Sequence, residues 1–170
     1  MSFVHLHVHS EHSVLDGLSH LSDLVAHTKE LEMPAVALTD HGVLFGAVEF
    51  YRKARQHGIK PIIGLETYLS RRSMQDRDPK LDSRSFHQLL LAESQEGYRN
   101  LLKIASASQL EGFYYKPRID LEFLANHSEG LIATTSCLSG IVPRALQAGQ
   151  EAKAVQHLDW YFEVFGRDRF

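Results

Sequence analysis

Short apolar runs alternate along this chain with longer segments of helical period, and this alternation limits its fold more than any other feature. The runs predicted as strands lie at 4–8, 35–39, 61–69, 87–92 and 130–134. Apolar residues spaced by three or four predict helices at 19–33, 44–56, 96–109, 120–125, 139–147 and 151–165. Such alternation is typical of parallel βαβ units, so we predict an α/β protein, either a barrel or an open doubly wound sheet.

The composition agrees with one domain over residues 1–170, because 44% of the residues are hydrophobic and can supply a sizeable core. The formal net charge is −3 with neutral histidines. This charge argues against a surface that binds nucleic acid through bulk positive charge. It does not exclude DNA as a substrate, since bound metal ions add local positive charge.

The sequence also bears on location. Cys137 is the only cysteine, so no internal disulfide can form, which fits a reducing cytoplasm. No window reaches the roughly 20 apolar residues that a membrane helix needs. The opening string MSFVHLHVHS lacks the basic region of a secretory signal. We therefore expect a cytoplasmic protein without a membrane partner.

Histidines gather at the ends of the first two predicted strands. His7 and His9 alternate in the string FVHLHVHS, and alternate residues of an extended chain point the same way. His5, one step deeper, is expected to pack behind them. The second strand ends in TDHG, with Asp40 and His41. Because neutral imidazole is the commonest metal ligand, these two strand ends predict a metal site at one edge of the sheet.

Further candidates come from the later strands. Glu66 lies within an apolar strand, where a carboxylate is unfavourable unless it is paired or binds a metal. Cys137 follows the fifth strand. His41 is interpreted as a ligand that a carboxylate orients. Asp40, the candidate catalytic residue, is then its carboxylate partner or a weak ligand.

For three residues the sequence alone leaves the role open. Asp16 lies in the string LDG, and Asp-Gly is a common turn pair. His87 begins its strand instead of ending it. Cys137 has the alternative role of a small buried apolar residue.

Two segments show no regular spacing of apolar residues. In residues 70–85 the basic side chains are offset by acidic ones, which indicates a solvated loop and not a phosphate-binding one. In residues 112–118, GFYYKPR, we favour a packed aromatic loop over one that stacks on a nucleic-acid strand.

Taken together, the strings FVHLHVHSEHSVLDG and ALTDHGVLFGAVEFYRKARQHGIKPIIGLETYL resemble the PHP (polymerase and histidinol phosphatase) domain family. The string LEGFYYKPRIDLEFL resembles the branch of that family found in bacterial replicative DNA polymerases. The resemblance implies a distorted (β/α)7 barrel, incomplete at the C-terminus of this chain, which would be the N-terminal portion of a longer polymerase.

The resemblance also implies a cluster of two or three metal ions. The ligands carried over by position are His7, His9, Asp16, His41, Glu66, His87 and Cys137. Two further family ligands, an Asp and a His, would come from a later strand beyond Phe170. Mixed imidazole, carboxylate and thiolate ligands suit zinc, with manganese or iron as alternatives.

The activity implied is metal-dependent phosphoester hydrolysis, either 3′–5′ exonuclease or pyrophosphatase. The implied partners are DNA through the full-length polymerase, the remaining polymerase domains and other replisome subunits. Two alternatives stay open: a catalytically silent structural module of the polymerase, and a stand-alone phosphatase of the histidinol-phosphatase type.

Overall fold

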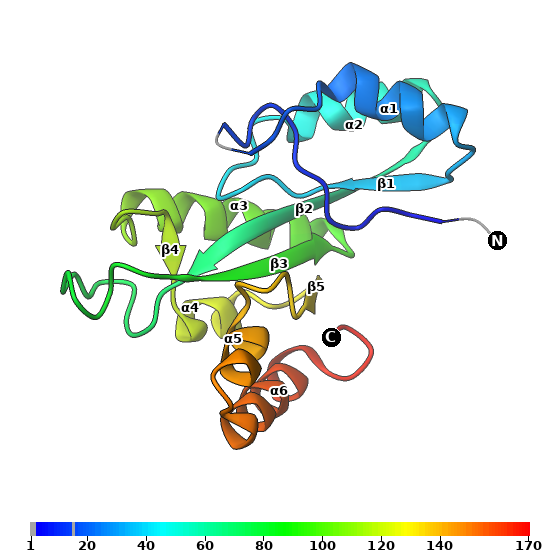
Figure 1. Cartoon of the computed structure of the whole chain (residues 1–170). Coiled ribbons are helices and arrows are strands. Elements are labelled where there is room, and N and C mark those ends of the chain that lie inside the picture. Colours follow the sequence, from blue (N-terminus) through cyan, green and yellow to red (C-terminus); the bar gives the residue numbers. More distant parts are fainter. Residues whose placement is uncertain (1–2, 15) are drawn as a thin grey trace.

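The computed structural model describes residues 3–14 and 16–170, which form a five-stranded sheet flanked by helices (Figure 1). The strands are β1 (Ala35–Leu38), β2 (Lys60–Leu69), β3 (Phe86–Ala92), β4 (Arg118–Ile119) and β5 (Leu131–Thr134). The helices are α1 (Leu21–Glu30), α2 (Ala47–Gln56), α3 (Gln95–Leu110), α4 (Leu121–Asn126), α5 (Ile141–Gln147) and α6 (Glu151–Phe165). The α/β prediction is confirmed, and the sheet formed by the described residues is open.

The sheet is mixed and not purely parallel. Its order is β1-β2-β3-β5, with β4 paired to the end of β2. β1 and β4 run parallel to β2, whereas β3 runs antiparallel to both β2 and β5. The prediction of parallel units throughout is therefore wrong at β3. The physical reason is the connection: residues 70–85 contain no helix, and a parallel neighbour needs a crossover, usually a helical one.

The first predicted strand, residues 4–8, is corrected to an extended segment with one isolated parallel bridge to β1, made by His5. It still runs beside β1, because Ala37 N donates to His5 O at 2.9 Å and Thr39 N donates to Val8 O at 2.8 Å. The segment lies outside β1 at the margin of the sheet. His5 is therefore exposed, which corrects the expectation that it packs behind the other histidines.

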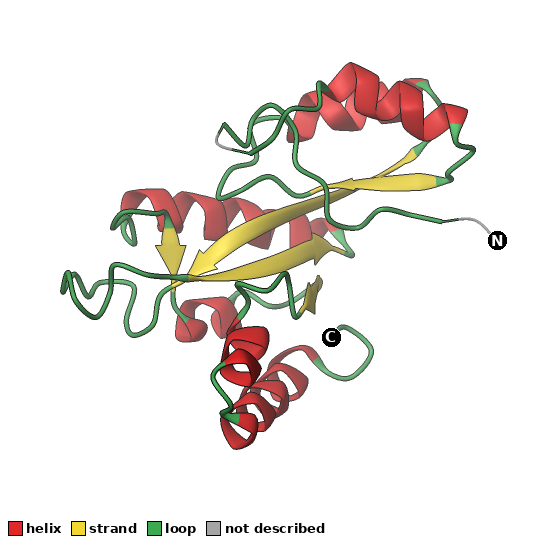
Figure 2. Cartoon of the chain, viewed as in Figure 1, coloured by secondary structure: helices red, strands yellow, loops and turns green. Residues whose placement is uncertain are grey.

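Helices lie on both sides of the sheet and bury two apolar clusters. α1 and α2 lie beside β1 and the beginning of β2, whereas α5 and α6 lie beside β3 and β5 (Figures 1 and 2). The smaller cluster includes Val25, Val36 and Phe50. The larger one includes Leu65 and Leu90 and is covered by α3 and α6. In the described residues, no helix combines the length and the apolar character that a membrane span requires.

A buried arginine holds the 70–85 loop against the sheet. Arg118 is 1% exposed, and its guanidinium donates to four backbone carbonyls. The acceptors are Gly112 at 3.1 Å, Asp82 at 3.0 Å, Met74 at 3.3 Å and Asp76 at 3.0 Å. Met74 and Asp82 are buried, so the expectation of a solvated loop is wrong for this part. The expectation of a packed aromatic loop holds for Tyr114, whose ring centre lies 5.2 Å from the Arg118 guanidinium, but Phe113 and Tyr115 are exposed.

The loop also contains an ion pair. The Asp82 carboxylate accepts hydrogen bonds from Arg72 Nε at 3.0 Å, Arg72 Nη2 at 2.6 Å and Asp78 N at 2.8 Å. The hydrogen bond from Arg72 holds the pKa of Asp82 below its ordinary value of 3.8. A carboxyl whose pKa is lower in the folded chain stabilises the fold fully above its unfolded pKa. That contribution is lost as the pH falls through the folded pKa.

We therefore expect Asp82→Asn to be less stable than the parent chain at about pH 6, with the difference shrinking below about pH 4. Urea denaturation across this pH range measures both free energies of unfolding. Asp159→Asn, at an exposed position of α6, is the matched control and should show no such pH-dependent difference. If the difference in free energy of unfolding between Asp82→Asn and the parent stays constant with pH, the Asp82 carboxylate does not make this pH-dependent contribution.

Candidate metal centre

The sheet brings the predicted ligands to one edge, because β3 is reversed. β1 and β2 end at this edge, β3 begins there, and β5 ends there. In the register, Tyr68 of β2 pairs with His87, and Leu89 of β3 pairs with both Glu66 and Thr134. A histidine at the beginning of an antiparallel strand thus lies beside the ends of its neighbours. This explains His87, which looked misplaced when all strands were taken as parallel.

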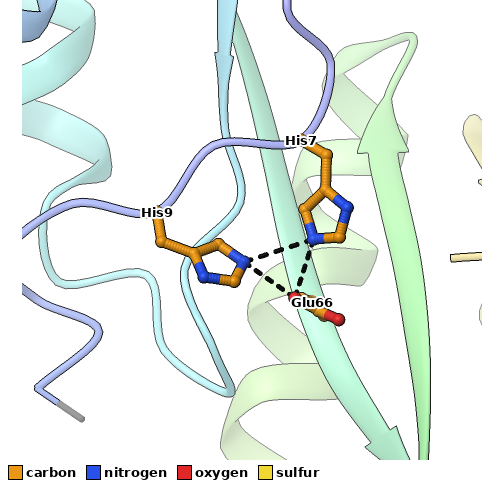
Figure 3. A group of neighbouring side chains, drawn as sticks. All are labelled: His7, His9 and Glu66. Atoms are coloured by element: carbon orange, nitrogen blue, oxygen red, sulfur yellow. Dashed lines mark hydrogen bonds and ion pairs between the residues drawn. The ribbon is translucent and has the colours of Figure 1, made fainter. Parts of the chain in front are cut away.

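Glu66 is the centre of the site. The residue is 1% exposed, and its Oε2 lies 2.8 Å from His7 Nε2 and 2.7 Å from His9 Nε2. Its other oxygen, Oε1, lies 2.8 Å from His87 Nδ1. Figure 3 shows the rings of His7 and His9, from the N-terminal segment, pointing toward the carboxylate on β2. Their Nε2 atoms are 3.2 Å apart, so two imidazoles and one carboxylate converge on the same point.

Asp16 and His41 extend the site toward solvent. Asp16 Oδ2 lies 2.9 Å from His41 Nε2 and 3.3 Å from His9 Nδ1. The other ring nitrogen of His41, Nδ1, lies 3.4 Å from Glu66 Oε2. That nitrogen is buried and has no hydrogen-bond partner among the described residues.

These contacts define three overlapping groups of donor atoms. Within each group, the donor atoms all lie within 4.8 Å of one another. The groups are His7–His9–Glu66, His9–Asp16–His41 and His41–Glu66–His87. We call their six members the histidine–carboxylate cluster. The structure therefore brings together six of the seven residues predicted as ligands.

The electrostatics of the cluster keep the carboxylate ionised. Burial by itself raises the pKa of Glu66, but hydrogen bonds from His7, His87 and His9 outweigh it and hold this pKa well below its usual range. The hydrogen bond to Glu66 raises the pKa of His9 despite its burial. Burial lowers the pKa of His41, even though Glu66 and Asp16 oppose this effect. His41 therefore favours the neutral imidazole that a metal ion needs.

Cys137, the seventh candidate, lies beside the cluster. It follows β5, and its Sγ lies 3.6 Å from His87 Nδ1 and 3.7 Å from Glu66 Oε1. The side chain is exposed, which argues against the alternative role as a small buried apolar residue. The antiparallel pairing of β5 with β3 gives this proximity, because it places the end of β5 next to the beginning of β3.

Asp40 lies apart from the cluster. Its buried carboxylate accepts hydrogen bonds from Ser10 N at 2.6 Å, Ser10 Oγ at 2.9 Å and Ser13 Oγ at 3.0 Å. Ser13 Oγ also accepts from His41 N at 3.0 Å. The carboxylate therefore holds the turn that follows His9 and, through Ser13, the backbone of His41.

Some residues around the cluster were not predicted from the sequence. The Tyr68 ring stacks on His41, with centroids 5.7 Å apart, and meets the edge of His87 at 5.1 Å. Burial and the charge of Glu66 raise the pKa of Tyr68 to about 12. Its position two residues after Glu66 in one strand was an available signal, since such residues share a face. Ser10 and Ser13 carried no comparable signal.

Comparison with known proteins identifies the family of this chain. Residues 5–170 match the PHP domain family. The chain belongs to this family. The PHP domain is 48% identical to DNA polymerase III subunit alpha of Borreliella burgdorferi, over 98% of this chain and 15% of that protein. It is also 48% identical to the subunit alpha of Thermus aquaticus, over 100% of this chain and 14% of that protein.

The PHP domain thus spans about 15% of the length of the curated relatives it matches. Among solved structures, it aligns with a protein from Bifidobacterium adolescentis described as a metal-dependent phosphoesterase. The TM-score is 0.45 and the sequence identity 18%, over 64% of this chain and 33% of that chain.

Proposed function

We propose that this chain is the N-terminal PHP portion of a bacterial DNA polymerase III alpha subunit and that its cluster binds metal ions to hydrolyse phosphoesters. The observation that carries the proposal is the convergence of imidazole and carboxylate donors on Glu66 from separate segments of the chain. The identity to alpha subunits along the whole chain supports the polymerase context.

The donor set fits two or three divalent ions. His41 Nδ1 is buried without a hydrogen-bond partner among the described residues, which is unfavourable unless a cation binds there. The ligands would be the six cluster residues together with Cys137. Imidazole nitrogen, carboxylate oxygen and a thiol suit zinc first, with manganese or iron as alternatives.

When bound, such ions polarise a phosphoester oxygen and lower the pKa of a coordinated water. The residues of this chain supply the rest. Glu66 stays ionised and offsets part of the cationic charge. Tyr68 keeps its proton at neutral pH and can donate a hydrogen bond to a phosphate oxygen. Asp40, whose oxygens are bound to Ser10 and Ser13, fixes the turn that carries the ligands and acts through their placement.

The proposed reaction is 3′–5′ exonuclease or pyrophosphatase activity in the cytoplasm. Its proposed partners are DNA, the remaining polymerase domains and other replisome subunits.

A pair of histidine variants in the full-length polymerase, with its DNA synthesis inactivated, tests the proposal. His9 contacts Glu66 and Asp16, whereas His5 is exposed and outside the cluster. We expect His9→Ala to slow the release of nucleotides from 3′-labelled DNA, or the hydrolysis of pyrophosphate, by about 100-fold or more. His5→Ala should keep the parent rate. Hydrolysis that is absent from the parent, or equal in both variants, would favour the structural module.

A further inference from the structure

A second charged site lies between the 70–85 loop and the last two helices. It is a cavity of about 630 Å³. Its basic lining residues are Arg71, Arg84, Arg144, Lys153 and His157. The first two come from the loop, the third from α5, and the last two lie one turn apart on α6. Basic groups from three segments that are distant in sequence therefore line one cavity.

No carboxylate balances this charge. The lining contains no Asp or Glu. Arg144 donates to Gln147 Oε1 and Ser139 Oγ, both at 3.3 Å and both neutral. Over residues 3–14 and 16–170, none of the five basic groups forms an ion pair with an acidic side chain. Arg72, in the same loop, differs because it pairs with Asp82. In a chain with a net charge of −3, this concentration of unpaired positive charge is a local feature and not a consequence of composition.

The exposed cations have no acidic partner in the cavity lining, so a bound anion would reduce their mutual repulsion. Burial lowers the pKa of His157, and the charge of Lys153 lowers it further. The contribution of Lys153 has the sign expected where positive charge is not balanced. Arginine is well suited to phosphate, because its planar fork binds two phosphate oxygens at once. The chemistry of the lining therefore selects phosphate groups.

The shape of the site favours a compact ligand. Its volume lies within the range of about 300–1,000 Å³ typical of small-molecule sites. Phe86 lines the cavity, and the Arg71 guanidinium lies 5.5 Å from its ring centre. Ile141 and Ala145 of α5 also line the cavity, and most of its remaining lining residues are polar. A hollow lined by several cations suits a small polyphosphate better than an extended strand, for which a basic groove is typical.

The cavity is distinct from the histidine–carboxylate cluster. Phe86 lines the cavity, while the next residue, His87, belongs to the cluster. Adjacent side chains of a strand point to opposite faces, so the two sites lie on opposite faces of β3. We propose that this cavity binds a compact ligand with two or more linked phosphates, either inorganic pyrophosphate or a nucleoside triphosphate.

Calorimetric titration of the whole chain with pyrophosphate and with dATP, in buffer free of metal and chelator, tests the proposal. We expect each probe to bind with one-to-one stoichiometry. The double variant Arg84→Gln/Arg144→Gln should weaken binding at least about tenfold, since it removes two charge-assisted contacts. Equal affinities for the two probes would assign the site to pyrophosphate, whereas tighter binding of dATP would assign it to nucleotides.

Two controls and one replacement variant make the result specific. Arg55→Gln/Lys60→Gln changes the net charge equally at exposed positions elsewhere and should leave the affinity unchanged. Glu66→Gln should also leave it unchanged, which separates this site from the metal centre. If the cavity variant does not fold, Lys153→Gln at an exposed position of α6 replaces it, with an expected loss of about threefold.

Several outcomes would overturn the proposal. They are no binding by the parent chain, equal weakening in both double variants, no weakening in the cavity variant, and loss of binding in Glu66→Gln. Tighter binding of single-stranded DNA than of either small probe, with the same dependence on Arg84 and Arg144, would show an extended strand to be the ligand.

Discussion

Glu66→Gln is expected to remove most of the bound metal from this PHP domain. Glu66 belongs to two of the three donor groups and contacts His7, His9 and His87. A glutamine has nearly the same shape, but it carries no charge and presents N–H donors where the site needs acceptors. We expect zinc affinity to fall at least about 100-fold, which exceeds the usual effect of losing a residue outside the ligand set.

Metal analysis of the purified protein after dialysis against zinc-free buffer measures this effect. Glu93→Gln is the matched control, because Glu93 is exposed and follows the other end of β3. The control should retain the parent's metal content. If Glu66→Gln also retains it, the convergence on Glu66 is a hydrogen-bonded network of histidines around a buried carboxylate and not a metal centre.

Arg118→Met is expected to lower the free energy of unfolding by about 3–5 kcal/mol, because the buried guanidinium satisfies four backbone carbonyls. Methionine fills a similar length but donates no hydrogen bonds. The change leaves four carbonyls without their guanidinium donor, and each buried unsatisfied group costs about 1–3 kcal/mol. The expected loss is smaller than the largest sum of these four costs, because water can reach the carbonyls once the loop loosens.

Urea denaturation of the parent and the variant measures the loss. Arg77→Met provides the comparison, since Arg77 is exposed and donates one 3.3 Å hydrogen bond, to Glu111 O. Its effect should stay within about 0.5 kcal/mol, as for most surface substitutions. Similar small losses for both variants would mean that the 70–85 loop does not depend on Arg118. Arg71 and Arg84 belong to this loop and line the basic cavity. We therefore expect Arg118→Met to weaken phosphate binding in that cavity as well.

The sequence by itself determined the six helices, the strands β1, β2, β3 and β5, and where the first ligands lie, but it did not indicate β4. His7 and His9 converge because alternate residues of an extended segment face the same way, and this holds although the segment forms only one bridge. Glu66 was recognised because a carboxylate in an apolar strand needs a partner. Both inferences rest on local geometry, which is set by residues that are adjacent in the sequence.

The tertiary structure decided what depends on pairing between distant segments. The direction of β3 places His87 and Cys137 beside Glu66, and no local pattern reports the direction of a strand. Asp16 reaches His41 across 25 positions of sequence. Arg71 and Arg84 belong to a loop predicted to be solvated, and both are exposed, yet the packing of α5 and α6 makes them line one cavity. Such contacts follow from how the sheet and helices pack, because side chains far apart in sequence meet only after the chain has chosen its topology.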